Sequence, residues 1–215
     1  MSQKKPKLFN LRRFPQDVAR IVCAPLLWLL RPIRLTPEGK KYTERLEGAA
    51  ILSANHTSFF DPFAVGLTFW RRRIFFFVAE VVMKGAFRSF LLKGVGCIKV
   101  ERSIADVEAL KKAIGILKEG HPLTVFPQGG IKDGDGVEAL KSGAVLMALR
   151  ADVPIIPMYI YKRKHWYSRL KVVIGKTIYP SQMTTKKIPS TADITNISEA
   201  LMQEMNRCRN YDKEN

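Results

Sequence analysis

An imidazole and a carboxylate lie five residues apart in the segment 55–61 (NHTSFFD). On a continuous helix His56 and Asp61 would be separated by about 140° and could not touch. A turn between them would fold Asp61 back onto the ring, and Pro62 favours a helix start with Asp61 as its N-cap. An aspartate in that place fixes the tautomer of the histidine and stabilises the imidazolium formed by proton transfer. The pattern therefore predicts a general base.

The same residues also allow a purely structural interpretation. Asp61 then only caps a helix, and His56 is a loop residue whose hydrogen bonds are satisfied. The H-x4-D pattern is short and common, so taken alone it favours this interpretation. Its place at a strand-to-helix junction, where α/β proteins position reactive groups, supports the catalytic one.

Two further segments follow predicted strands and could bind substrate. In segment 94–103 (GVGCIKVERS), the planar guanidinium of Arg102 suits a phosphate held beside the amides of a helix start. In segment 125–131 (VFPQGGI), two glycines let the backbone approach a ligand closely. The structural alternatives are a surface charge in the first segment and a plain loop in the second.

Other catalytic schemes lack the residues that they need. The sequence contains no G-x-G-x-x-G, no Walker loop and no G-x-S-x-G elbow. His121 and His165 have no metal-ligand spacing, and Ala144 stands where a calcium loop starting at Asp133 needs a glutamate. Cys97 lies in an apolar run and is predicted to be a core residue. We therefore expect no metal and no cofactor, and the three separated cysteines fit a reducing compartment.

Strands and helices alternate from Gly48 onwards. Short apolar runs predict strands, and apolar residues at helical spacing predict helices. The expected strands are 49–53, 74–79, 97–100, 123–126, 155–161 and 170–174, and the expected helices are 62–70, 87–93, 104–117, 137–150 and 194–205. The alternation predicts an α/β fold, with one layered domain at residues 46–215 around a mostly buried mixed sheet.

Positive charge is concentrated in two zones. The net charge is +17, from 36 Lys and Arg against 19 Asp and Glu. Residues 1–45 carry eleven basic and three acidic side chains, and residues 160–187 carry eight basic and no acidic ones. Two such zones on a nearly neutral body predict attraction to nucleic acid, anionic lipid, a phosphorylated substrate or an acidic carrier protein.

Residues 1–45 are predicted to form a basic, amphipathic, helical membrane-docking segment. The longest apolar stretch, residues 21–30, is too short to cross a bilayer, which needs about 20 apolar residues. Basic residues around a stretch with Trp28 fit the headgroup layer of an anionic membrane, although Pro25 and Pro32 interrupt any single long helix. The alternative is a helix packed on the protein's own core. We expect peripheral or monotopic association with the cytoplasmic face of a membrane.

Four segments together resemble the glycerolipid acyltransferase family, the relatives of bacterial 1-acyl-glycerol-3-phosphate acyltransferase. In chain order they are NHTSFFD (55–61), GCIKVERS (96–103), FPQGGI (126–131) and VPIIP (153–157), and KSGA (141–144) resembles the family's K-x-G-A stretch. The resemblance covers residues 48–175. One such motif is weak, whereas four in the family's order are specific.

The resemblance implies an O-acyltransferase of phospholipid biosynthesis. His56 would be the general base on an acceptor hydroxyl that attacks an acyl thioester directly, and Asp61 would orient it. The donor would be acyl-CoA or an acyl carrier protein, and the acceptor a lysophospholipid such as 1-acyl-glycerol-3-phosphate. The residues expected to bind substrate are Lys99, Arg102, Gln128, Gly129, Gly130 and Lys132.

The third motif departs from the family pattern. The usual F-P-E-G-T-R reads F-P-Q-G-G-I here, so Ile131 replaces an arginine. That arginine belongs to the family's site for the acceptor phosphate, and an isoleucine cannot bind an anion. Loss of one charged hydrogen bond costs about 1.5–3 kcal/mol, which is enough to change the acceptor preference. Lys132 lies one position after Ile131 and could replace the missing arginine in part.

Two other functional classes compete with an acyltransferase. A non-catalytic lipid- or carrier-binding relative fits the altered third motif but not the intact His56 and Asp61. A nucleic-acid binder fits the charge, but the basic zones lack interleaved aromatic residues apart from Trp166 and Tyr167 and carry no binding signature. We therefore expect no nucleic-acid partner.

Overall fold

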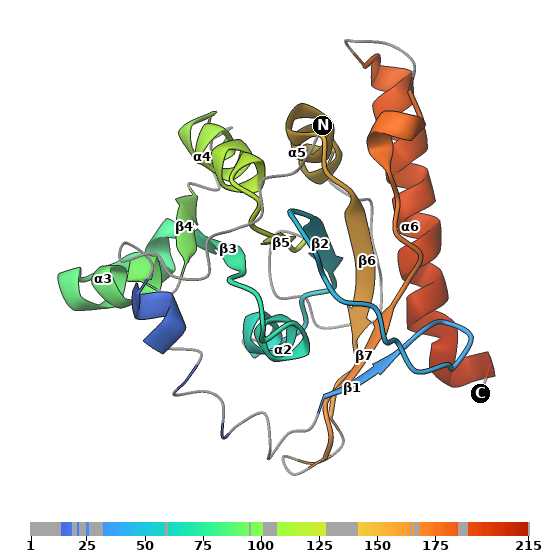
Figure 1. Cartoon of the computed structure of the whole chain (residues 1–215), viewed down its shortest axis with the longest axis horizontal. Coiled ribbons are helices and arrows are strands. Elements are labelled where there is room, and N and C mark those ends of the chain that lie inside the picture. The colour runs from blue at the N-terminus through green and yellow to red at the C-terminus, as the bar shows by residue number, and fades with distance from the viewer. Residues whose placement is uncertain are drawn as a thin grey trace.

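The apolar runs of the chain form the strands of a seven-stranded sheet (Figure 1). In the computed structural model the strands are β1 (Ile33–Leu35), β2 (Ile51–Ala54), β3 (Phe75–Ala79), β4 (Cys97–Val100), β5 (Leu123–Val125), β6 (Ile155–Ile160) and β7 (Lys171–Ile174). Their order across the sheet is β1-β7-β6-β2-β5-β3-β4. The sheet is mixed, because β7 runs antiparallel to β6 while all other neighbours pair in parallel. The prediction of an α/β fold with a mixed sheet is confirmed.

The structure describes most of the chain but not all of it. The described residues are 14–18, 21, 25, 32–58, 60–94, 96–100, 107–127, 142–163, 165, 168–184 and 189–214. Most of the predicted docking segment, and the predicted starts of the helices at 104 and 137, lie outside these residues.

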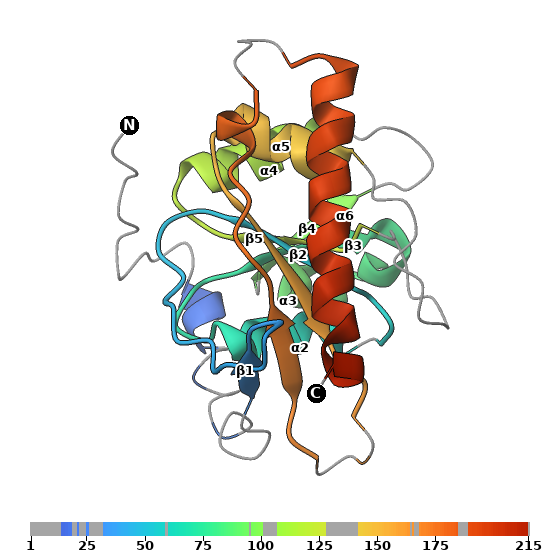
Figure 2. The same ribbon diagram turned by 90° about the vertical axis from the view of Figure 1, so that its right-hand side faces the viewer.

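Helices cover both faces of the sheet (Figure 1). They are α2 (Asp61–Thr68), α3 (Ala86–Gly94), α4 (Val107–Lys118), α5 (Gly143–Ala151) and α6 (Thr191–Glu214), with short 3-10 helices η2 (Glu80–Met83) and η3 (Pro180–Gln182). α2 lies on one face and α4 and α5 lie on the other. The long α6 packs along β6 and β7 (Figure 2), and α3 stands beside the edge strand β4.

The two covered faces explain why the central strands are mostly apolar, with Ser53 and Thr124 as buried polar exceptions. β2 and β6 are buried along their whole length, as expected for parallel strands covered on both sides. One core joins α2 to the sheet through Ala64, Val65 and Phe69. The other joins α4, α5 and α6 to the opposite face, through residues that include Ala113, Leu117, Val145, Ala148, Ile197 and Leu201.

The helix spacing read from the sequence agrees with the observed burial. In α4, Ala109, Ala113, Ile116 and Leu117 are buried, which places them on one face at intervals of three and four residues. Gly120 ends this helical stretch with φ of 87°, a left-handed conformation that favours glycine.

The sequence did not indicate β1. Its three residues are only partly buried and stand between Pro32 and Pro37, so no apolar run marks them as a strand. Pairing reveals it, because Ile33–Leu35 lie in parallel register with Lys171–Val173 of β7. Part of the segment 1–45 is therefore built into the sheet, while the division of the chain at residue 45 stays a prediction. None of the described helices is long and apolar enough to cross a membrane.

Gly175 follows β7 and lies beneath α6. A Cβ at this position would lie 2.8 Å from Cys208 Sγ and 2.8 Å from Glu204 Cγ. Cys208 is fully buried, and the Glu204 carboxylate is held by the backbone N–H of Lys176 at 2.8 Å, so neither neighbour can move aside easily. We expect Gly175→Ala to lower the free energy of unfolding in urea by about 1–3 kcal/mol.

Gly115→Ala is the matched control. Gly115 is exposed within α4, and a Cβ there would meet nothing within 4 Å. This substitution should raise the free energy of unfolding by about 0.5–1 kcal/mol, because glycine weakens a helix. Equal effects of the two substitutions would contradict close packing of α6 on Gly175.

Candidate active site

Three neighbouring strands end at the same edge of the sheet. β2 pairs in parallel with β5 on one side and with β6 on the other, so the carboxyl ends of all three meet, where α/β folds place their sites. Asn55 and His56 follow β2, Phe126 follows β5, and Tyr161 follows β6. Loops far apart in the sequence are thereby brought together.

His56 and Asp61 contact each other within the loop after β2. Nδ1 of His56 lies 3.1 Å from Oδ2 of Asp61, and the two side chains are 14% and 5% exposed. An ionised carboxylate only accepts hydrogen bonds, so this contact requires the proton on Nδ1. Nε2 of the neutral ring is then left as a proton acceptor.

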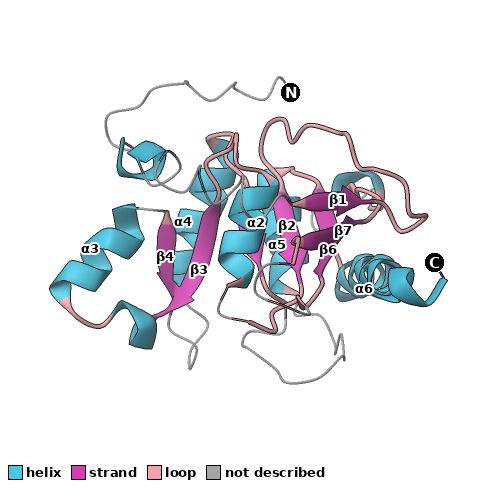
Figure 3. Cartoon of the chain, turned by 90° about the horizontal axis from the view of Figure 1, so that it is seen from below, coloured by secondary structure: helices cyan, strands magenta, loops and turns pink. Residues whose placement is uncertain are grey.

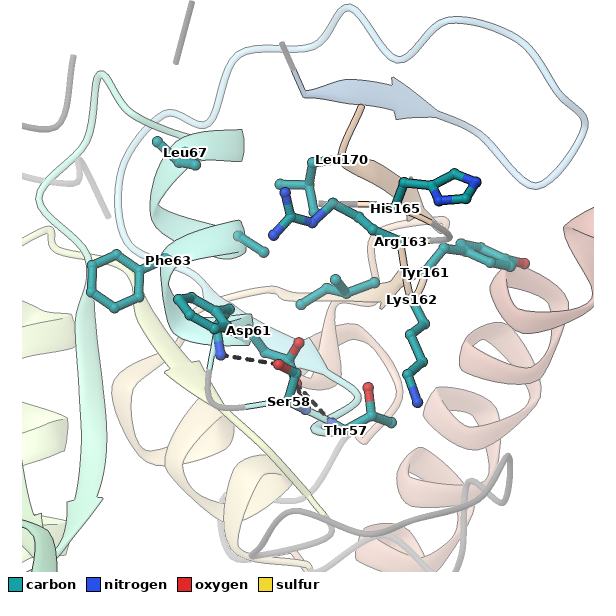
Figure 4. Close-up of a pocket in the computed structure, with 13 residues that line it drawn as sticks. Thr57, Ser58, Asp61, Phe63, Leu67, Tyr161, Lys162, Arg163, His165 and Leu170 are labelled. Atoms are coloured by element: carbon teal, nitrogen blue, oxygen red, sulfur yellow. Dashed lines mark hydrogen bonds between the residues drawn. The ribbon is translucent and has the colours of Figure 1, made fainter. Parts of the chain in front are cut away.

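The same carboxylate oxygen organises the loop around the histidine. The backbone N–H groups of Thr57 and Ser58 each donate to Oδ2 of Asp61 at 2.7 Å, as the dashed lines in Figure 4 show. The backbone N–H of Asp61 donates to the carbonyl of Ser58 at 3.1 Å, which closes a turn. The predicted turn that folds Asp61 back onto the ring is therefore present.

The predicted N-cap role of Asp61 is wrong. Phe60 is the N-cap residue and has no side-chain cap, while Asp61 is the first residue of α2. The Asp61 carboxylate turns back to the loop amides and the imidazole rather than forward to the first helical amides. Pro62 occupies one of the first helical positions as expected, where its missing N–H costs no hydrogen bond.

Asn55 anchors the histidine loop to the neighbouring strand. The backbone ladder between β2 and β6 has its last pair at Ala54 and Met158. Beyond it, Nδ2 of Asn55 donates to the carbonyl of Ile160 at 3.0 Å, and Oδ1 accepts from the N–H of Ile160 at 2.6 Å. The side chain is 2% exposed. It therefore continues the pairing while the backbone of β2 leaves the sheet.

Phe126 holds the imidazole from the opposite strand. Its ring stacks on the ring of His56 with centroids 4.3 Å apart and planes inclined by 24°. One edge of the imidazole is thus hydrogen-bonded by Asp61 and one face is covered by Phe126. Together the two contacts restrict rotation of the imidazole ring.

A pocket of about 340 Å³ lies beside Asp61, between α2 and the segment that follows β6 (Figure 4). In Figure 4 the side chain of Arg163 extends toward α2, and that of Lys162 extends toward Thr57. The pocket therefore combines an apolar wall with positive charge at its rim. Its lining residues are Thr57, Ser58, Phe60, Asp61, Phe63, Ala64, Leu67, Ile160, Tyr161, Lys162, Arg163, His165 and Leu170.

Lys99 is placed apart from the His56–Asp61 pair. It lies in the edge strand β4, three strands from β2, a separation of about 14 Å at the usual strand spacing. Its ammonium forms an ion pair with Glu80 at 2.7 Å, in which both side chains are about half exposed. The other residues predicted to bind substrate lie outside the described residues: Arg102, Gln128, Gly129, Gly130 and Lys132.

Cys97 is only partly buried in the edge strand β4, so it is not the core residue that the sequence predicted. Burial raises the pKa of its thiol to about 11, so little reactive thiolate forms near neutral pH. Among the described residues, no group of three or more His, Cys, Asp and Glu side chains could hold a metal ion.

Sequence reasoning missed the roles of Asn55 and Phe126. Both lie in motifs that were singled out, one directly before the histidine and one directly after a strand. No local pattern, however, shows that an asparagine will pair with the end of β6 or that a phenylalanine will stack on the imidazole. The basic zone 160–187 did signal the charge now seen at the pocket rim.

The fold and the paired histidine and aspartate define the class of this protein. A sequence model of the family described as Acyltransferase matches residues 34–161. This match covers more than half of the chain, which therefore belongs to the acyltransferase family. The matched range includes two of the three residues of β1, all of β2 through β6 and the whole His56 loop.

Two curated proteins similar to this chain carry the same name. A 1-acyl-sn-glycerol-3-phosphate acyltransferase of Bacillus subtilis is 22% identical over 165 residues, which are 74% of this chain and 81% of that protein. Its counterpart of Borreliella burgdorferi is 28% identical over 119 residues, 54% of this chain and 47% of that protein. The crystal structure of the LPA acyltransferase PlsC of Thermotoga maritima matches 91% of this chain and 80% of its own, with a TM-score of 0.59 and 18% identity. That likeness shows a common fold.

Asn55→Ala should destabilise the fold. The substitution leaves the buried N–H and carbonyl of Ile160 without their partner, and each such loss costs about 1–3 kcal/mol. We expect the free energy of unfolding in urea to fall by at least about 2 kcal/mol. Asn196→Ala on the exposed face of α6 should change it by less than about 0.5 kcal/mol. An equally small effect of Asn55→Ala would contradict the anchoring role.

Proposed function

We propose that this protein transfers an acyl group from a thioester to the hydroxyl of a lysophospholipid, with His56 as the general base. The observation that carries the proposal is the contact between Nδ1 of His56 and the buried carboxylate of Asp61. It supplies a neutral imidazole whose Nε2 accepts a proton, next to a charge that stabilises the imidazolium.

The proposed reaction proceeds without a covalent acyl-enzyme. Nε2 of His56 takes the proton of the acceptor hydroxyl while its oxygen attacks the carbonyl carbon of the thioester. The C–S bond then breaks, and the thiolate leaves with the bonding electrons. The imidazolium returns the proton to the thiolate, which yields the ester and a free thiol. We predict that backbone amides near Gly129 and Gly130 stabilise the oxyanion.

The pocket beside Asp61 supports an amphiphilic substrate. Its apolar wall suits an acyl chain, and Lys162 and Arg163 bring positive charge to the same cavity. A lysophospholipid with a phosphate combines these two properties, and the names of the curated relatives favour 1-acyl-glycerol-3-phosphate. We assign the headgroup to this rim, because Ile131 replaces the arginine that the related motif carries. Acyl-CoA or an acyl carrier protein is the proposed donor.

The proposed setting is the cytoplasmic face of a membrane, in phospholipid biosynthesis. Acceptors of this kind are dissolved in the bilayer, and the basic residues 1–45 would hold the enzyme on an anionic surface as a peripheral protein. The replacement of arginine by Ile131 favours one alternative, an acceptor whose headgroup needs less cationic contact. A non-catalytic lipid- or carrier-binding protein is the other alternative.

Substitution of the base should abolish turnover. We expect His56→Ala to lower the rate of thiol release from acyl-CoA or acyl carrier protein by about 10²- to 10⁴-fold, and Asp61→Asn to lower it by a similar factor because the tautomer is lost. Asp152→Asn is the matched control, since Asp152 is exposed and has φ of 53°, which asparagine tolerates. A His56→Ala protein that is folded and as active as wild type would exclude the general-base role.

Substitution of Arg163 should distinguish acceptors. We expect Arg163→Ala to raise KM for lysophosphatidate by about tenfold, the loss of one charged hydrogen bond, and to change KM little for neutral lysolipids. Arg150→Ala, at an exposed position of α5 on the other face of the sheet, is the control. Equal effects on charged and neutral acceptors would show that Arg163 does not hold the headgroup.

A further inference from the structure

Two large apolar side chains on α3 are left in water. Phe87 is 76% exposed and Phe90 is 71% exposed. They are three residues apart, so they lie on the same side of the helix. α3 stands at the edge of the sheet beside β4, apart from α4 and α5 (Figures 1 and 3). A pair of neighbouring exposed phenylalanines indicates a binding surface rather than a scattered apolar residue.

The helical residues 14–18, blue in Figure 1, lie beside α3. A Cβ on Gly94, the last residue of α3, would lie 3.2 Å from Cβ of Pro15. The outer side chains of this helical turn remain in water, with Phe14 52% exposed and Val18 40% exposed. These two residues are four apart and share one side of the turn. A second apolar pair therefore lies near the C-terminal end of α3.

An ion pair fixes residues 14–18 to the sheet. Nε of Arg73 donates to Oδ1 of Asp17 at 2.9 Å, and its Nη2 donates to Oδ2 at 2.6 Å. Arg73 is 7% exposed and stands just before β3. Such a two-pronged contact adds directional specificity to charge attraction. The N-terminal turn is thus held beside the start of β3, next to the end of α3.

The charge around α3 indicates which kind of partner binds this surface. Lys84 and Lys93 flank the two phenylalanines and are exposed. Residues 81–100 contain no Asp or Glu. Protein interfaces deplete lysine at their centre, whereas apolar side chains flanked by lysine are typical of helices that lie in the headgroup layer of anionic lipid.

We propose that α3 and residues 14–18 form a docking face, made of Phe14, Val18, Phe87 and Phe90 with Lys84 and Lys93, that binds an anionic bilayer. The phenylalanines insert between lipids, and the two lysines contact their phosphates. This inference rests on the proposed function for its purpose, because the substrates are membrane lipids. Binding to a bilayer is measured without turnover. A failure of the docking proposal is therefore distinguishable from a failure of the proposed acyl transfer.

Flotation of the full chain with vesicles tests the docking face. The vesicles contain equal parts of phosphatidylglycerol and phosphatidylcholine, or phosphatidylcholine alone. We expect wild type to float with the anionic vesicles, and Phe87→Ser/Phe90→Ser to bind them at least about tenfold more weakly. Lys84→Gln/Lys93→Gln should weaken binding at low salt and reduce its salt dependence. Turnover of a detergent-dispersed acceptor should be unchanged in both variants.

The control variant changes two exposed apolar residues elsewhere. Tyr179 and Met183 are 49% and 45% exposed and flank η3, which packs beside α5. Tyr179→Ser/Met183→Ser should float like wild type. A Phe87→Trp variant adds a direct measurement, since its fluorescence should shift to shorter wavelength with anionic vesicles.

Three results would overturn the proposal. One is flotation of Phe87→Ser/Phe90→Ser equal to that of wild type, and another is an unshifted Phe87→Trp spectrum in vesicles to which the protein binds. The third is a wild-type dimer in light scattering that Phe87→Ser/Phe90→Ser converts to a monomer, because a second copy of the chain then covers this face.

Discussion

The candidate site depends on one carboxylate oxygen. Oδ2 of Asp61 receives the Nδ1 edge of His56 and the backbone N–H groups of Thr57 and Ser58. These contacts determine the tautomer of the imidazole and the path of the loop at the same time. Because Asp61 is also the first residue of α2, the loop geometry is tied to a helix packed on the sheet. The side chain of Asp61 therefore links the position of α2 to the position of the imidazole.

The sheet supplies the remaining constraints from both sides. β5 brings the ring of Phe126 onto the imidazole, and β6 receives the side chain of Asn55. All three strands are parallel neighbours, so their carboxyl ends lie together for a topological reason and not through loop packing. Apolar cores on both faces of the sheet hold the scaffold. The polar loop residues position the imidazole on it, and Asn55 also satisfies buried backbone groups of Ile160.

The sequence predicted the fold and the central pair because both leave local signals. Apolar runs such as residues 97–100 mark strands, and the five-residue interval between His56 and Asp61 excludes a continuous helix between them. Contacts across long sequence distances leave no such signal. Asn55 and Ile160 are 105 residues apart, and β1 becomes a strand only through its register with β7. The N-cap prediction for Asp61 failed for a local reason, because the carboxylate accepts from the N–H groups of Thr57 and Ser58 in the loop behind it.

The side-chain amide of Asn55 connects the histidine loop to the pocket. It ties the first residue of the histidine loop to the last residue of β6, and the pocket rim of Tyr161, Lys162 and Arg163 begins at the next peptide bond. The pocket and the histidine loop are thus joined by one pair of hydrogen bonds between Asn55 and Ile160. The end of β6 that lines the pocket is therefore the same piece of backbone that anchors the loop of the base.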